Sequence, residues 1–295
     1  MYQLFPEPLF PDPMSRTDRA REILRKAHAV SPSPSLLRIE EQIRRGDGSS
    51  RQLASLIEGS PALAARVLRM ANSAFYAPLD QVSSLNRAVT MLGETVIRQL
   101  VLTSLVLSRR SGLRSPEEAL ATARVMGDAV RAAAICRSLA EMTRISSPDE
   151  AFSTGLLHDL GHIYLLDDVG ASYVAYLLSG YTEDALAHEE ELAGTTHEDV
   201  GAAFAFDWNL PDGIASAMRE HHSASPMSLP ALVHAADTIV RELNHNDADG
   251  ADASAAAVDE ALAAIGVDRP AWAARVDKVR DEYGSLLTLF ESMAA

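Results

Sequence analysis

Cysteine is almost absent from this chain of 295 residues, in which Cys136 stands alone. One cysteine cannot form a disulfide within the chain, so we expect a reducing compartment, the cytoplasm. No run of about 18 apolar residues occurs, and we therefore expect no transmembrane helix. The first residues, MYQLFPEPLFPDPM, contain four prolines and no apolar run, which is not the pattern of a signal peptide.

Positive charge is scarce in the second half of the chain. Residues 146–295 contain 6 Lys+Arg and 27 Asp+Glu, whereas residues 1–145 contain 20 and 14. The formal net charge of −15 argues against general affinity for nucleic acid. The asymmetry indicates either two surfaces with different partners or two lobes that attract one another. The basic stretch at 16–26 is likewise either a contact for another chain or a solvated cap on the fold.

Strand patterns are missing as well, and helical periodicity runs through most of the chain. We predict an all-α protein with a Pro-rich N-terminal segment and short basic helix in residues 1–30. A helical sub-bundle follows at about 31–112, and a second helical lobe at about 115–292. Within that lobe, the segment 147–166 reads as one helix.

Helix starts and breaks carry local signals. Ser60 is a suitable N-cap, and Pro61 occupies the first helical position. Ser115 and Ser147 each precede a glutamate by three residues, which is the capping-box pattern. Gly93 separates two apolar periodic segments, so we expect a break between two helices there.

Histidine is concentrated in one region. Of the nine histidines, seven lie between residues 158 and 237, and Asp159 and Asp237 accompany them. Histidine and carboxylate together suit divalent Zn, Fe, Mn, Co or Ni. His158 and His162 share one helical face, whereas His221 and His222 point about 100° apart, so without a bend we expect at most one of this pair to face a given point. Hydrogen bonds between buried histidines and carboxylates are the alternative explanation.

Several stretches resemble the HDOD domain, the HD-related output domain of bacterial signalling proteins. They are PALAARVLRMANSAFY, DEAFSTGLLHDLGHIYL, THEDVGAAFAFDWNLPDGIASAMREHH and LPALVHAAD. The resemblance covers residues 30–292, nearly the whole chain. It implies a multi-helix HDOD fold with an N-terminal sub-bundle and a C-terminal lobe related to the HD metal-dependent phosphohydrolases.

The resemblance also implies a set of metal ligands. The matching positions are His158, Asp159, His197, His221, His222 and Asp237. Two departures stand out: the first histidine of the HD pattern is missing, with Asp128 or a near neighbour at its place, and His162 stands where active HD-GYP phosphodiesterases have lysine. The downstream GYP-type motif is not evident either.

These departures favour a non-catalytic regulatory module of bacterial signal transduction. It would act through protein–protein contacts with signalling proteins or through a nucleotide second messenger. The alternative is a metal-dependent phosphohydrolase or cyclic di-nucleotide phosphodiesterase with an altered HD site. A third hypothesis keeps a metal only as a structural element or sensor. No membrane or nucleic-acid partner is expected, and a homodimer is left open.

Overall fold

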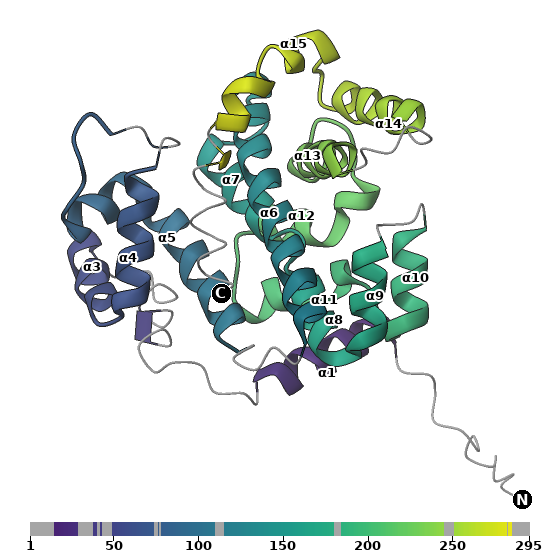
Figure 1. Cartoon of the computed structure of the whole chain (residues 1–295), viewed down its shortest axis with the longest axis horizontal. Coiled ribbons are helices and arrows are strands. Elements are labelled where there is room, and N and C mark those ends of the chain that lie inside the picture. Colours follow the sequence, from purple (N-terminus) through teal and green to yellow (C-terminus); the bar gives the residue numbers. More distant parts are fainter. Residues whose placement is uncertain are drawn as a thin grey trace, which may run out of the picture.

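The computed structural model describes residues 15–28, 38–39, 42, 49–73, 76, 78–109, 115–179, 184–244, 251–281 and 283–284. Every regular element in these ranges is a helix, which confirms the predicted all-α class (Figure 1). The helices are α1 Arg16–His28, α3 Ser50–Glu58, α4 Pro61–Ala71, α5 Leu85–Arg109, α6 Pro116–Thr143, α7 Pro148–Leu157, α8 Leu160–Val169, α9 Ala171–Ser179, α10 Ala185–Ala193, α11 His197–Asp207, α12 Asp212–Glu220, the 3₁₀ turn η1 His221–Ser223, α13 Leu229–Asn244, α14 Ala251–Ala264 and α15 Arg269–Ala273. In the described ranges no helix has the length and hydropathy that a membrane span requires.

Helices α3, α4 and α5 pack on one another, and α5 also contacts α7. The side chains of Leu53, Ile57, Val67 and Ile97 are buried between them. Gly93 interrupts α5 with φ 77° and ψ 159°, a backbone conformation that glycine adopts without steric cost. The predicted break between two helices is therefore present.

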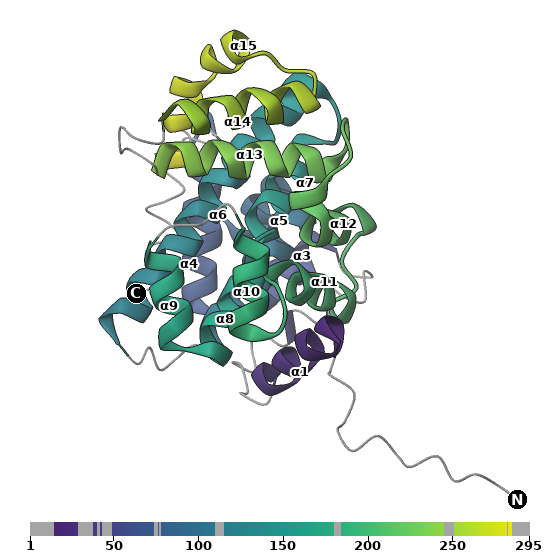
Figure 2. The same cartoon turned by 90° about the vertical axis from the view of Figure 1, so that its right-hand side faces the viewer.

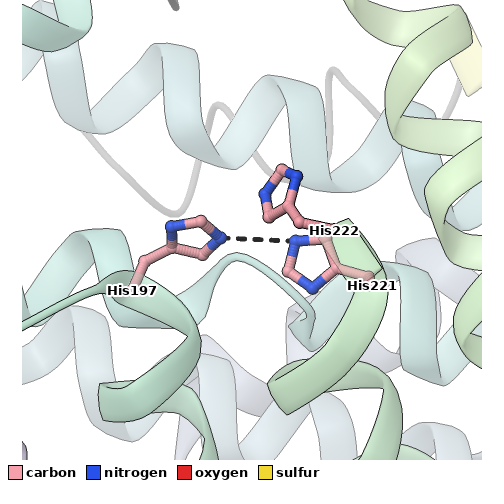
Figure 3. Close-up of side chains that lie close together, drawn as sticks. All are labelled: His197, His221 and His222. Atoms are coloured by element: carbon pink, nitrogen blue, oxygen red, sulfur yellow. Dashed lines mark hydrogen bonds between the residues drawn. The ribbon is translucent and has the colours of Figure 1, made fainter. Parts of the chain in front are cut away.

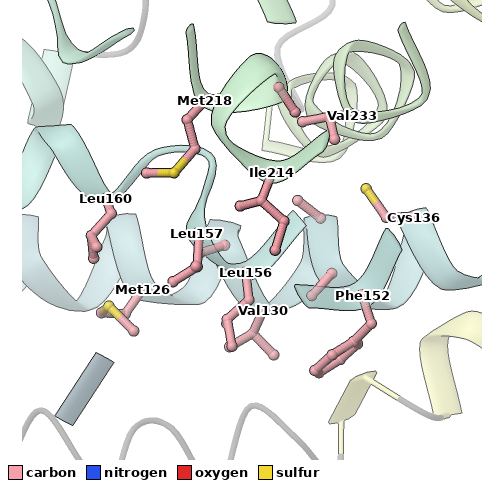
Figure 4. Packing of buried hydrophobic residues seen from close by; sticks show 14 of the residues in the cluster. Met126, Val130, Cys136, Phe152, Leu156, Leu157, Leu160, Ile214, Met218 and Val233 are labelled. Atoms are coloured by element: carbon pink, nitrogen blue, oxygen red, sulfur yellow. The ribbon is translucent and has the colours of Figure 1, made fainter. Parts of the chain in front are cut away.

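Helix α6 runs through the middle of the second lobe, with α7 and α13 packed against it (Figure 1). Small residues on α6 let α7 approach closely: a Cβ on Gly155 would lie 2.8 Å from both Ala133 Cα and Cys136 Sγ. Apolar side chains of α7 and α12, Phe152 and Ile214 among them, fill the surrounding core (Figure 4). This packing fixes the C-terminal end of α7 in the interior of the lobe.

The segment predicted as one helix over 147–166 is two helices, and this prediction was wrong. Helix α7 ends at Leu157 and α8 begins at Leu160, with Asp159 between them at φ −97° and ψ 12°. The amide of His162 donates to the carbonyl oxygen of Asp159, three residues back, instead of four. The reason is tertiary, because Gly161 lies against the backbone of His197 on α11.

Helix α1 packs on the second lobe, against α8 and α11 (Figure 2). Its apolar face, with Ala20, Ile23 and Leu24, is buried there. The basic helix is thus a cap on the fold along this face. The predicted domain limits stay a prediction, as does everything placed in residues 1–14 and 285–292, which lie outside the described residues.

Candidate metal centre

The predicted ligands that the fold brings together come from the α7–α8 junction and from the starts of α11 and η1. His158 and Asp159 form the junction, His197 is the first residue of α11, and His221 is the first residue of η1. All four side chains are buried, and none is more than 5% exposed. Figure 3 shows His197 and His221 facing each other, with His222 beside them.

One ring nitrogen of each histidine is already engaged. His158 Nδ1 donates to the carbonyl oxygen of Gly155 at 2.8 Å, and His221 Nδ1 donates to the carbonyl oxygen of Ala217 at 3.0 Å. A carbonyl oxygen only accepts, so Nδ1 carries the hydrogen and Nε2 of the neutral ring keeps its lone pair. Both Nε2 atoms are thereby left available to a cation.

The Nδ1 atoms of His197 and His162 are held by a carboxylate and a phenol hydroxyl, respectively. His197 Nδ1 lies 2.8 and 2.9 Å from the two carboxylate oxygens of Glu189, which also accepts from the His197 backbone N–H at 2.8 Å. His162 Nδ1 lies 2.7 Å from the Tyr173 hydroxyl. Metal-binding histidines in proteins are held in this way by carboxylates, carbonyl groups or hydroxyls behind the ring.

The free Nε2 atoms converge on the carboxylate of Asp159. Asp159 Oδ2 lies 3.2 Å from His158 Nε2, and Asp159 Oδ1 lies 3.5 and 3.6 Å from Nε2 of His197 and His221. Nε2 of His197 and Nε2 of His221 are 3.3 Å apart (Figure 3). Two lone pairs at that distance repel unless a proton or a metal ion lies between them.

Two atoms at the centre lack a hydrogen-bond partner although they are buried. These are His158 Nε2 and Asp159 Oδ1. Unsatisfied buried polar atoms are costly, and a cation between them would satisfy both. Three imidazole nitrogens and a carboxylate oxygen are a donor set that first-row divalent metals accept. The residues present therefore fit a metal ion.

Protons and carboxylates stabilise the centre without a metal. Burial opposes the imidazolium of His158, but Asp159 and Asp237 outweigh it and raise its pKa to about 10. Burial likewise opposes the charge on His197, yet Glu189 and Asp159 raise its pKa to about 9. The pKa of Asp159 is held well below its usual range, against the effect of burial, by His158 and His162.

His222 and Asp237 lie at the edge of this cluster. The His222 amide donates to Glu198 Oε1 at 3.0 Å, and burial lowers the pKa of its ring. A ligand atom of His222 lies within 4.8 Å of ligand atoms of both His197 and His221. Neighbouring histidines thus reach the same site, which the expectation allowed only where the helix bends, because they begin a 3₁₀ turn. Asp237 Oδ1 lies 4.0 Å from His158 Nε2, while Oδ2 accepts from Arg241 at 2.8 Å.

Asp128, placed by the resemblance at the position of the missing histidine, points to other partners. Its Oδ1 accepts from Arg131 Nη1 and from Asn244 Nδ2, each at 3.0 Å. It belongs to none of the described groups whose ligand atoms lie within 4.8 Å of one another. Burial raises the pKa of this carboxyl, and the neighbouring Asp237 adds to the rise. Its part in metal binding stays a prediction.

Sequence reasoning missed the residues behind the ligands. Glu189, Tyr173 and Glu198 are set in place by tertiary packing, at spacings that match no helical or motif pattern. The sequence offered one signal. Glu189 is a carboxylate on the short helix α10, which directly precedes α11 and its first residue, His197.

Similar proteins are found in several bacteria. A Treponema pallidum (strain Nichols) protein, uncharacterized, is 23% identical over 211 residues, which span 70% of this chain and 40% of that protein. A proposed phosphohydrolase from Shewanella amazonensis SB2B superposes with a TM-score of 0.67 at 23% identity, covering 90% of this chain and 97% of that chain.

Two further solved structures share this fold. An HDOD domain protein with unknown function from Geobacter sulfurreducens has a TM-score of 0.58 at 22% identity, covering 93% of this chain and 98% of that one. A proposed signal transduction protein from Marinobacter aquaeolei VT8 has a TM-score of 0.62 at 20% identity, covering 95% and 67%. The HDOD domain model matches residues 30–224, more than half of the sequence, and the chain belongs to the HDOD family.

Proposed function

We propose that this protein is a non-catalytic signalling module whose buried His/Asp centre binds a divalent metal as part of the fold. The observation that carries the proposal is the closure of the centre: the side chains of His158, His197 and His221 are at most 1% exposed. A catalytic metal keeps an open coordination position for water and substrate. Ligands enclosed to this degree suit a structural or sensing ion better.

His158, His197 and His221 would hold the metal together with Asp159, through the atoms that converge there. A bound divalent ion, one of Fe, Mn, Zn, Co or Ni, supplies positive charge that neutralises the carboxylate and joins three segments of the chain. Because a metal that binds only the folded state stabilises it by mass action, the ion would couple the lobe's stability to metal supply.

The family membership supports a role in signalling, and the Marinobacter relative is a proposed signal transduction protein. The module would act on a signalling protein by direct contact, or it would respond to a nucleotide second messenger. The missing first histidine and the histidine at position 162 also favour a module that has lost hydrolysis.

The alternative is a metal-dependent phosphohydrolase or cyclic di-nucleotide phosphodiesterase. The adjacent His158 and Asp159, joined by His197 and His221, retain the donor types of the HD enzymes, and the Shewanella relative is described as a proposed phosphohydrolase. In such an enzyme these residues would hold a divalent metal, which would supply Lewis acidity to activate water and to polarise a phosphoryl oxygen.

Metal content and hydrolysis, measured on the same preparations, separate these proposals. Elemental analysis is paired with assays on cyclic di-GMP and bis(p-nitrophenyl) phosphate for the native chain, His158→Ala and His188→Ala. His188 contacts Tyr176 and belongs to none of the described ligand groups, so it is the matched control. We expect stoichiometric metal in the native chain and His188→Ala, loss in His158→Ala, and no turnover. Turnover that His158→Ala abolishes would establish the enzyme, and absence of metal would refute the metal centre.

A further inference from the structure

A cavity of about 390 Å³ lies away from the metal centre, between α6, α13, α15 and the side chains of Val276, Val279, Arg280 and Tyr283. Its volume falls at the lower end of the roughly 300–1,000 Å³ that small-molecule sites occupy. None of the residues that converge at the metal centre lines it. It is therefore a second candidate binding site.

Apolar side chains, most of them aliphatic, make up the larger part of the cavity wall. Ile135 of α6, Ile239 of α13, and Val276 and Val279 beyond α15 face it, together with the ring of Trp272. Four of these five side chains are buried or nearly so, and Val276 is half-buried. Branched aliphatic walls favour a hydrocarbon body, because burying it removes apolar area from water.

Positive charge gathers at the same cavity. Arg131, Arg269 and Arg280 line it, against a single carboxylate, Glu242. The chain has only 6 Lys+Arg after residue 145, and two of them are at this site. Glu242 is paired with Arg269 Nη2 at 3.1 Å, so the lining carboxylate is already neutralised. The arginines are paired as well: Arg131 with Asp128, Arg269 also with Asp259, and Arg280 with Asp277. A ligand carboxylate would therefore bind through the guanidinium N–H groups that these pairs do not use.

Arg131 is held in a fixed orientation before any ligand arrives. Its Nη1 donates to Asp128 Oδ1 and Asn244 Oδ1, and its guanidinium lies over the Tyr283 ring, 5.6 Å from the centroid. A guanidinium fixed in this way loses little freedom when a carboxylate binds to its remaining N–H groups. Asp128 thereby acts as a support for this cavity.

The same contacts disfavour a nucleotide. Recognition of a base requires polar side chains at its edge, and the one amide in the lining, Asn244, already uses Oδ1 for Arg131 and Nδ2 for Asp128. We propose that this cavity binds a small aliphatic carboxylate, such as a medium-chain fatty acid, with its chain on the α6–α13 wall and its carboxylate at the arginines. The proposal concerns binding and is independent of the proposed function.

Binding of decanoate to the full chain, followed by isothermal titration calorimetry, tests this site. Ala273 lines the cavity on α15, whereas Ala271 is exposed on the same helix and does not. We expect saturable binding of one decanoate to the native chain and to Ala271→Trp, and affinity weaker by about tenfold or more, about 1.4 kcal/mol, in Ala273→Trp. Equal binding by the two tryptophan variants, or no binding by the native chain, would overturn the proposal.

The charge requirement has its own controls, which also serve if Ala273→Trp fails to fold. Arg280→Gln removes a lining cation, whereas Lys278→Gln removes a half-exposed cation that pairs with Glu141 outside the cavity. We expect weaker decanoate binding in Arg280→Gln alone, and weaker binding of decanol than of decanoate by the native chain. Competition by GMP or cyclic di-GMP stronger than that of octanoate would contradict the aliphatic assignment and identify a nucleotide site.

Discussion

At the scale of one residue, the metal centre depends on the close backbone contact between Gly161 and His197. A Cβ at this position would overlap the carbonyl oxygen of His197 and lie 2.8 Å from the carbonyl carbon. We predict that Gly161→Ala forces α8 and α11 apart, weakens metal binding, and lowers the free energy of unfolding by about 1–3 kcal/mol. Chemical denaturation of the purified variant measures this loss.

Gly201 is the matched control for that substitution. It is also a buried helical glycine, but the atoms nearest to a Cβ there are those of Met218 at 3.4–3.5 Å, which are ordinary contact distances. Gly201→Ala should therefore be neutral or stabilising by up to about 1 kcal/mol through helix propensity. If both variants lose the same stability, the close contact at Gly161 is not the cause.

Glu189 orients His197 from behind, through both its ring and its backbone N–H. We predict that Glu189→Gln weakens metal affinity by about 10- to 100-fold, because outer-shell partners of metal-bound histidines typically contribute that much. Chelator competition measures the affinity. Glu190→Gln changes the adjacent, half-exposed carboxylate that pairs with Arg16, and should leave metal affinity as it is. Equal metal affinities in the two variants would show that Glu189 does not support metal binding.

Cys136 is a packing residue, as its Ala-rich helix suggested. The thiol is fully buried, and burial raises its pKa. Since the thiolate is the reactive form, we predict that a disulfide reagent labels the native protein only as fast as the protein opens, and labels the unfolded chain at once. The rate of colour release in native buffer and in guanidinium chloride measures the difference. Immediate stoichiometric labelling of the native protein would contradict the structure.

At the scale of helices, the N-cap of α7 is a test of local sequence signals. Ser147 Oγ accepts from the Glu150 amide at 3.2 Å, as the Ser-x-x-Glu pattern predicted. We expect Ser147→Ala to lower the free energy of unfolding by about 1 kcal/mol. Ser146→Ala, one residue earlier and outside the cap, should cost less. Thermal unfolding of the two variants compares them, and equal losses would mean that the cap contributes nothing.

Local signals were sufficient where a helix start or break depends on neighbouring residues. The side chains of Ser115 and Ser147 accept from the predicted glutamate amides, which is the serine half of each capping box, and Gly93 breaks α5. Ser60 stands at the N-cap of α4 with Pro61 after it, but its side chain makes no cap hydrogen bond. The break at His158–Asp159 was missed because both sides read as apolar helix. It arises from packing of Gly161 on His197, which lies 36 positions further along the chain and leaves no periodic trace.

At the scale of the whole molecule, the candidate site was partly readable. Family resemblance supplied the ligand types at His158, Asp159, His197 and His221, and the structure places the Asp159 carboxylate within 3.6 Å of Nε2 of each of the three histidines. Their supports, such as Glu189, were not readable, because the α10–α11 connection that positions them is set by the rest of the fold. Contacts between the two halves account for part of their difference in charge. Arg16 and Arg19 of the basic helix α1 pair with Glu190 and Asp168 of the second lobe.

Helix α1 should therefore act on the metal centre through the turn before His197. Arg19 pairs with Asp168 and donates from Nε to the Ala193 carbonyl oxygen at 3.0 Å, at the end of α10. We predict that Arg19→Gln lowers the free energy of unfolding by about 1–2 kcal/mol, because hydrogen bonds to charged, part-buried groups contribute in that range. The loss should shrink in high salt, which screens the Asp168 pair.

Arg21 is the control, because it is exposed and pairs with Asp18 on the same helix. Arg21→Gln should keep both the stability and the metal affinity of the native chain, whereas Arg19→Gln should weaken both. Denaturation at two salt concentrations and chelator competition measure the pair of variants. Stability lost equally in the two, or metal affinity unchanged in Arg19→Gln, would show that α1 covers the lobe without positioning His197.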